Sequence, residues 1–181
     1  MADKPVSKMS DDDKARTLQG FVYDAQTVSR EWRAQSWTDC AFLDGKQWTD
    51  DEEDEASDSG LELLTINRTF PIVNLILGSQ AIQRTEITAK GRTQADNELS
   101  QVMSEAIAFV SDQCEGDYLV AQAFRDQVVP GFGCISPCYS TDPRQETITW
   151  KLRDWKEVLW DPFASPWFDP LHCRYVIHQR W

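Results

Sequence analysis

The stretches Gly133-Cys-Ile-Ser-Pro-Cys-Tyr139 and Thr147-Ile-Thr-Trp-Lys-Leu152 mark a change in the spacing of apolar residues along the chain. Within them apolar and polar residues alternate, which is the period of a β-strand with one buried face. The residues between them, Thr141-Asp-Pro-Arg-Gln145, are typical of a turn. The sequence therefore predicts a β-hairpin here, and residues 155–160 and 173–178 are expected to add extended segments.

Before this hairpin, apolar residues recur at steps of three and four, which predicts helices. The predicted helices cover residues 15–37, 71–84, 96–114 and 118–129. The second of these is apolar around most of its circumference, so we expect it to be buried between neighbouring elements. The fold class is therefore α+β, with helices in the first two thirds of the chain and a small, mostly antiparallel sheet in the last third.

Three shorter segments complete the outline. Residues 50–58 are strongly acidic and are interpreted as a solvated loop or a frayed helix, because the ligand spacing of a calcium-binding loop is absent. Residues 61–66 are predicted to form a short strand or an extended approach segment. Residues 85–90 alternate and are predicted to form a strand.

Composition excludes several classes of protein. The chain has 181 residues, 41% hydrophobic and 27% charged, which excludes a disordered or collagen-like chain. A net charge of -12 disfavours a monomer that wraps nucleic acid, because that mode requires a basic face. Residues 1–14 are expected to form a mobile polar tail without an export signal, followed by one α+β region over residues 15–181.

The sequence contains no pattern that indicates catalysis. The nucleophile elbow, the phosphate-binding loop and the dinucleotide-binding fingerprint are all missing, so we expect no enzyme, no catalytic residues and no cofactor. One alternative is a small zinc-stabilised binding module that uses Cys134, Cys138, His172 and Cys173. On a regular strand the first two thiols would lie about 13 Å apart, too far to share one ion, so packing thiols are favoured.

Tryptophan is unusually frequent, with eight residues in the chain. Five of them lie near its end: Trp150, Trp155, Trp160, Trp167 and Trp181. These five are candidates for contacts between subunits, because interfaces use aromatic anchors; the alternative is a tryptophan-rich core. The last predicted strand is also expected to leave an open edge that further chain or another subunit covers.

The order of several motifs carries a resemblance. They are Phe42-Leu-Asp-Gly-Lys-Gln-Trp48, Leu64-Thr-Ile-Asn-Arg68, Pro71-Ile-Val-Asn-Leu-Ile-Leu-Gly78, Gln83-Arg84-Thr-Glu-Ile87, Trp155-Lys-Glu-Val-Leu-Trp-Asp-Pro162 and Arg174-Tyr-Val-Ile-His-Gln-Arg-Trp181. In this order they resemble the amino-terminal region of bacteriophage portal proteins of the P22-like type. The resemblance covers residues 17–181.

The resemblance implies a structural subunit of a dodecameric ring at one capsid vertex, the head-to-tail connector. Its partners would be identical subunits, terminase, capsid proteins and tail or adaptor proteins, with no membrane. Double-stranded DNA would pass through the ring during packaging and ejection without sequence-specific binding. The chain would belong to the virion, after assembly in the host cytoplasm, and would form part of the peripheral wing, incomplete at its C-terminal end.

Overall fold

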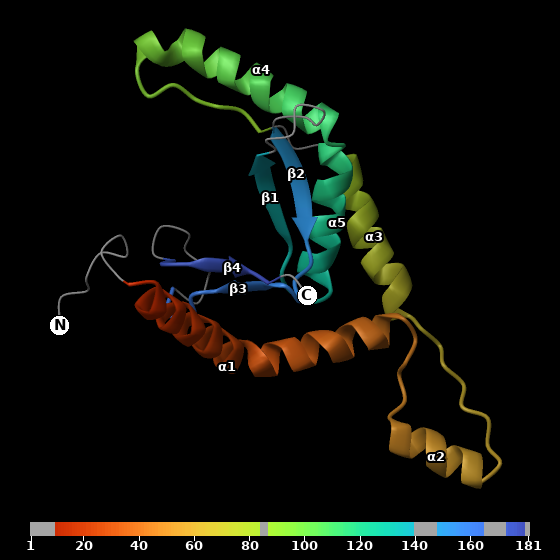
Figure 1. Ribbon diagram of the computed structural model, residues 1–181. Helices are drawn as coiled ribbons and strands as arrows, with labels where there is room; N and C mark the ends of the chain where they lie inside the picture. Colours follow the sequence, from red (N-terminus) through yellow and green to blue (C-terminus); the bar gives the residue numbers. More distant parts are fainter. Residues whose placement is uncertain (1–9, 84–86, 140–147, 165–172, 180–181) are drawn as a thin grey trace. The chain divides into compact units, whose positions relative to one another are not determined.

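A computed structural model describes residues 10–83, 87–139, 148–164 and 173–179 of the protein (Figure 1). Its helices are α1 (Asp11–Leu43), α2 (Asp50–Asp58), α3 (Thr69–Ile82), the short 3-10 helix η2 (Gln94–Asp96), α4 (Asn97–Gln113) and α5 (Gly116–Val128). Its strands are β1 (Cys134–Tyr139), β2 (Ile148–Arg153), β3 (Val158–Trp160) and β4 (Val176–His178). Helices precede strands, so the predicted α+β class is confirmed.

The strands form two separate two-stranded sheets where the sequence predicted a single small one. Strands β1 and β2 pair antiparallel, with Cys134 opposite Arg153, which confirms the predicted hairpin. Strands β3 and β4 also pair antiparallel, with Val158 opposite His178. The turn expected at residues 141–145 lies outside the described residues.

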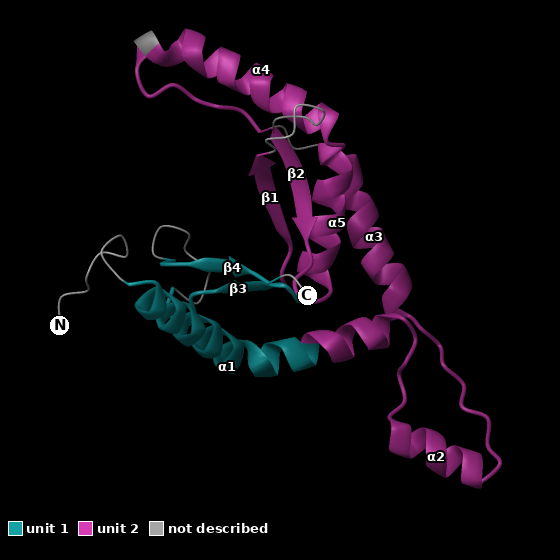
Figure 2. Ribbon diagram, viewed as in Figure 1, with its two compact units in different colours: residues 1–35, 156–181 teal, residues 36–155 magenta. Residues whose placement is uncertain are grey.

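The chain divides into two compact units (Figure 2). Unit 1 consists of residues 1–35 and 156–181, and unit 2 consists of residues 36–155. Helix α1 is continuous through the boundary at residue 35. We describe each unit by itself.

In unit 1 the first part of α1 packs against β3. Val158 and Leu159 are each only 2% exposed, which makes β3 the centre of this unit's core. The Arg33 guanidinium on α1 donates hydrogen bonds to the carbonyl oxygens of Lys156 and Val158. Helix α1 therefore covers the outer edge of β3 and satisfies carbonyl groups that no strand pairs there.

In unit 2, helix α5 contacts α3, α4 and both strands of the β1–β2 hairpin. The approach of α5 to the start of the hairpin is very close, because a Cβ atom placed on Gly133 would lie 1.9 Å from the Ala123 carbonyl oxygen. Ser36, which is 1% exposed, donates a hydrogen bond of 2.8 Å to the Pro130 carbonyl oxygen. This bond fixes the end of α1 to the turn that follows α5.

Several element boundaries differ from the sequence predictions. Helix α1 begins at Asp11 and ends at Leu43, so it is longer at both ends than the predicted residues 15–37. The acidic run forms the regular helix α2. Its first turn has a capping box, in which the Thr49 side chain and the Glu52 carboxylate satisfy backbone N–H groups reciprocally.

The strand predicted over residues 85–90 does not form in residues 87–90, and residues 84–86 lie outside the described part. The backbone there is extended without a strand partner. The Ser104 hydroxyl on α4 accepts from the Ala89 N–H at 2.9 Å and also lies 3.4 Å from the Ala89 carbonyl oxygen. A side chain therefore binds backbone groups that a β-ladder would otherwise use.

Candidate subunit interface

Helix α3 contradicts the prediction that it is buried between neighbours. None of its 14 residues is buried. Val73, Leu77 and Gln80 are half-buried on the side of α3 that the spacing places together, and α3 contacts α5. Five large apolar side chains are between 41% and 84% exposed: Phe70, Ile72, Leu75, Ile76 and Ile82. The helix is apolar around most of its circumference, as expected, but none of the described elements covers one of its faces.

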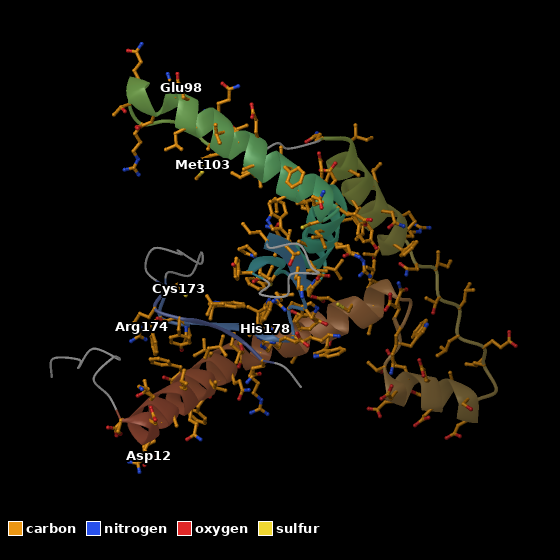
Figure 3. All side chains as sticks on the ribbon, turned by 45° about the horizontal axis from the view of Figure 1, so that its top comes forward. Asp12, Glu98, Met103, Cys173, Arg174 and His178 are labelled. Atoms are coloured by element: carbon orange, nitrogen blue, oxygen red, sulfur yellow. The ribbon has the colours of Figure 1, made fainter. Side chains whose placement is uncertain are left out.

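Helix α4 adds a second apolar surface. Leu99, Val102, Met103 and Phe109 are each more than half exposed. Their spacing of three, four and ten residues from Leu99 places them on one face of the helix. Met103 projects from α4, as does Glu98 near its start (Figure 3). Each of these two helices exposes several large apolar side chains, which is typical of a protein interface.

The predicted tryptophan set divides into packed and undescribed residues. Trp155 is 4% exposed and meets Trp37 edge to face, with ring centroids 5.6 Å apart. Trp160 is half-buried and meets Trp32 on α1 in the same geometry at 5.5 Å. Trp150 is half-buried, and its backbone N–H donates to the Cys114 sulfur.

The other two tryptophans, Trp167 and Trp181, lie outside the described residues. Contacts of Trp155 and Trp160 therefore stabilise their own chain, as expected for aromatic pairs. The role of the five residues in contacts between subunits stays a prediction.

The zinc alternative gains no support from the structure. Within the described part of the chain, no group of three or more His, Cys, Asp or Glu side chains could hold a metal ion. Cys134 and Cys138 lie on β1, whereas Cys173 belongs to unit 1, and His172 lies outside the described residues. The Arg153 guanidinium donates to the Cys138 sulfur at 3.0 Å, so the chain itself satisfies this thiol.

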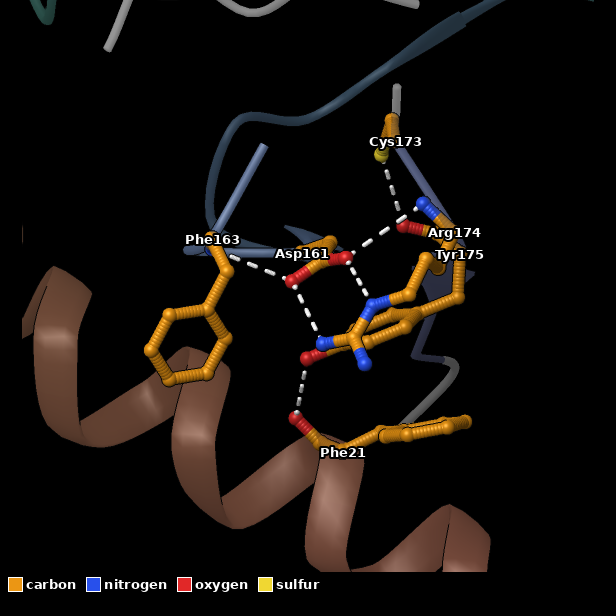
Figure 4. Close-up of polar contacts among 6 residues, drawn as sticks. All are labelled: Phe21, Asp161, Phe163, Cys173, Arg174 and Tyr175. Carbon is orange, nitrogen blue, oxygen red and sulfur yellow. Dashed lines mark hydrogen bonds and ion pairs between the residues drawn. The ribbon is translucent and has the colours of Figure 1, made fainter. Parts of the chain in front are cut away.

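The segment that leads into β4 is held by a polar cluster on unit 1 that the sequence analysis missed (Figure 4). Asp161 is 1% exposed, and its Oδ2 lies 2.6 Å from Arg174 Nε. The same carboxylate also accepts hydrogen bonds from Arg174 Nη2, from the Arg174 backbone N–H and from the Phe163 backbone N–H. The carboxylate is therefore fully satisfied although it is buried.

Aromatic contacts join this cluster to α1. The Tyr175 and Phe21 rings stack with centroids 4.2 Å apart, and the Tyr175 hydroxyl donates to the Phe21 carbonyl oxygen at 3.1 Å. The Arg174 guanidinium lies over the Phe21 and Phe163 rings at 5.9 and 5.8 Å. Burial raises the pKa of the Tyr175 phenol, so the hydroxyl stays a donor.

The hydrogen bonds from Arg174 lower the pKa of Asp161 to about 2, against the opposing effect of burial. Asp161 is therefore ionised at every physiological pH. No spacing rule connects Asp161 with Arg174 13 residues later. A signal was present only in the residue types, because Asp161 follows one predicted extended segment and Arg174 lies near the start of another.

An acidic arm projects between α1 and α3 and comprises residues 44–68 (Figure 1). The Asn67 side chain closes its base by donating to the Leu43 carbonyl oxygen at 2.7 Å. Trp48 Nε1 donates to the Thr65 hydroxyl at 3.1 Å, which joins the outgoing and returning legs. Helix α2 forms the tip.

A family model described as phage P22-like portal protein matches residues 19–181. No curated protein sequence matches the chain. Among the described residues, no helix is both long enough and apolar enough to span a bilayer. Because the family model covers nearly the whole chain, the chain belongs to the phage P22-like portal protein family.

Proposed function

We propose that this chain is a non-enzymatic structural subunit of a portal ring at one capsid vertex. Portal proteins are structural proteins of the phage particle, and they act as rings together with capsid and other phage proteins. The ring would be a dodecamer and would act as the head-to-tail connector. Terminase would bind it during packaging, and tail or adaptor proteins would bind it afterwards, with assembly in the host cytoplasm.

The exposed apolar face of α3 is the observation that carries this proposal. A 14-residue helix without a single charged residue, and with Leu75 and Ile82 at 74% and 84% exposed, is poorly suited to face water. In a closed ring every subunit buries such a patch against its neighbour, so no copy of the patch stays exposed to water. Burial of one leucine side chain contributes about 1.5–3 kcal/mol, so several of them supply a substantial part of an interface.

The charge of the chain supports a conduit for double-stranded DNA. Each phosphate that a protein neutralises releases counterions, and the resulting gain in binding free energy would hold DNA in place. DNA that slides through a ring must not be held. A net charge of -12 minimises such binding and is consistent with passage in either direction.

The wing is the part of the ring to which we assign residues 15–181. The five tryptophans named above remain candidates for subunit contacts within it. For Trp150 and Trp160, which are only half-buried, part of each ring is available to a neighbour. The mobile tail expected at residues 1–14 would then lie outside the packed region, although residues 11–14 already belong to α1.

Imaging of phage particles tests the proposal. Gold-labelled antibody fragments against the α2 segment should mark a single vertex in opened or tailless particles. A label on all vertices, or on the tail alone, would exclude a portal role. A parallel label on a major capsid protein controls for access to the particle surface.

A further inference from the structure

Two extended segments of unit 2 have the spacing of strands but no strand partner among the described residues. One is the returning leg of the acidic arm, residues 61–66, and the other is residues 87–91, between α3 and η2. They lie at opposite ends of α3. The sequence predicted residues 61–66 as a short strand or extended segment and residues 85–90 as a strand, and neither described segment pairs with another described strand.

The returning leg is exposed along its whole length. All six of its residues are exposed, and four are large and apolar: Leu61, Leu63, Leu64 and Ile66. No backbone N–H or C=O group of residues 62–66 makes a hydrogen bond within the described chain. The Thr65 hydroxyl accepts a hydrogen bond from the Trp48 side chain. An extended, apolar segment with free backbone groups is the form that adds to another strand.

The arm is strongly acidic beside this leg. Helix α2 carries seven carboxylates and no basic residue: Asp50, Asp51, Glu52, Glu53, Asp54, Glu55 and Asp58. Lys46 pairs with Asp50 at 2.8 Å, and Glu52 is used in the capping box. The other five carboxylates form no salt bridge within the described chain, so a partner of the arm should be basic.

The second segment has the opposite charge. Residues 87–93 contain Lys90 and Arg92 and no acidic residue. Ile87 is 57% exposed, and both basic residues are exposed. The backbone groups of residues 87, 88, 90 and 91 make no hydrogen bond within the described chain. This segment can therefore accept a strand and presents positive charge to it.

The placement of the two segments favours pairing between copies. Helix α3 separates them, and its 14 residues span about 21 Å at 1.5 Å per residue. The arm is tied to the end of α1 by Asn67, at the far end of α3 from Lys90. A contact between unlike ends of two copies is heterologous, and such contacts form a ring when the rotation between neighbours closes.

We propose that in the assembled ring the returning leg of one subunit, residues 61–66, pairs as a β-strand with residues 87–91 of the neighbouring subunit. Helix α2 then lies beside Lys90 and Arg92 of that neighbour. Backbone hydrogen bonds would hold the contact, Leu64 and Ile87 would supply apolar burial, and the charges would select the correct end of the partner. This inference rests on the proposed ring.

Site-specific cross-linking tests the contact in the assembled complete gene product. The photoreactive amino acid benzoylphenylalanine replaces Leu64 in subunits of normal isotope content, which are co-assembled with ¹⁵N-labelled subunits. Mass spectrometry should find cross-links from position 64 to peptides containing residues 87–92 that join light and heavy chains. The control carries the same group at Tyr23, which is 69% exposed on α1, and should yield no such peptide.

Charge reversal gives a second test of the contact. The double variant Lys90→Glu/Arg92→Glu should lower the yield of this cross-link about tenfold at low salt, and Glu53→Lys/Asp54→Lys should restore it. If rings form but no cross-link reaches residues 87–92, or if all cross-links lie within one chain, the proposed pairing is wrong. The proposed ring would still stand. A product that never forms rings overturns the proposed function together with the pairing.

Discussion

Asp161 shows how a single buried residue organises unit 1. It accepts four hydrogen bonds, three of them from Arg174, and it holds the segment before β4 against α1. This residue was not singled out as a site from the sequence. A pair such as Asp161 and Arg174 follows from the pairing of β3 with β4, which brings them together, and no local spacing encodes it.

We expect Asp161→Asn to lower the free energy of unfolding by about 1–3 kcal/mol, because the amide cannot accept all four hydrogen bonds and carries no charge to pair with Arg174. Urea denaturation followed by tryptophan fluorescence measures this. The control is Asp51→Asn on the exposed face of α2, for which the midpoint should not move. Equal midpoints for both variants would show that the cluster does not stabilise the fold.

The stability of the folded chain should also depend on pH through the ionisation of Asp161. Because the pKa of Asp161 is lowered from 3.8 to about 2 in the folded chain, protonation favours the unfolded chain. The stabilisation is therefore complete above about pH 4 and is lost as the pH falls towards 2. The difference in unfolding free energy between wild type and Asp161→Asn should shrink across this interval, and a difference that is constant from pH 6 to 2.5 would contradict the assignment.

Among the elements, the helices and the β1–β2 hairpin were predictable, because their contacts are local, whereas the pairing of β3 with β4 was not. Apolar spacing located α1, α3, α4 and α5, because helical hydrogen bonds are local. A strand needs a partner elsewhere, so the apolar character of residues 61–66 and the alternation in residues 85–90 could not reveal that neither residues 61–66 nor residues 87–90 pair within the described chain. The burial of α3 was mispredicted for the same reason. The spacing of its residues shows that the helix is apolar, but it does not show which elements cover it.

The junction of α5 with β1 depends on the absence of a side chain at Gly133. A Cβ atom there would meet the Ala123 carbonyl oxygen at 1.9 Å, so Gly133→Ala should destabilise the chain by about 1–3 kcal/mol. Gly20 lies within α1, with nothing within 4 Å of an added Cβ. Gly20→Ala should therefore stabilise it by roughly 0.5–1 kcal/mol. Thermal unfolding compares the two, and shifts in the same direction would refute the close packing.

The capping box of α2 should keep the tip of the acidic arm helical. Thr49→Ala removes the side chain that accepts from the Glu52 N–H, at a cost of about 1 kcal/mol. Amide hydrogen exchange in residues 52–55 should accelerate about fivefold, while α1 is unchanged. Thr27→Ala, in the middle of α1, is the matched control, and unchanged exchange in α2 of the Thr49 variant would show that the cap is dispensable.

For the whole molecule, the proposed ring rests on apolar surface of α3 and α4 that is exposed in the described part of the chain. Composition excluded a disordered or collagen-like chain, and the order of motifs predicted the family. The identity of the uncovered surface required coordinates. Tryptophans drew attention in the sequence, yet Trp155 and Trp160 pack within their own chain, whereas α3 and α4 expose leucine, isoleucine and methionine.

A charge on the exposed face of α3 should prevent assembly without unfolding the subunit. Leu75→Lys places an ammonium group at a position that is 74% exposed in the single chain. The unfolding free energy, measured by urea denaturation, should therefore change by less than about 0.5 kcal/mol. In a ring the same charge would be desolvated without a partner. Size-exclusion chromatography should show loss of the ring for Leu75→Lys and a normal ring for Thr27→Lys on α1.

The molar mass of the complete gene product, measured by light scattering at increasing concentration, tests the ring most directly. We expect one closed species with the mass of many subunits, and no growth beyond that size. A product that remains monomeric at the highest concentration reached, with α3 protected from solvent in the monomer, would contradict it.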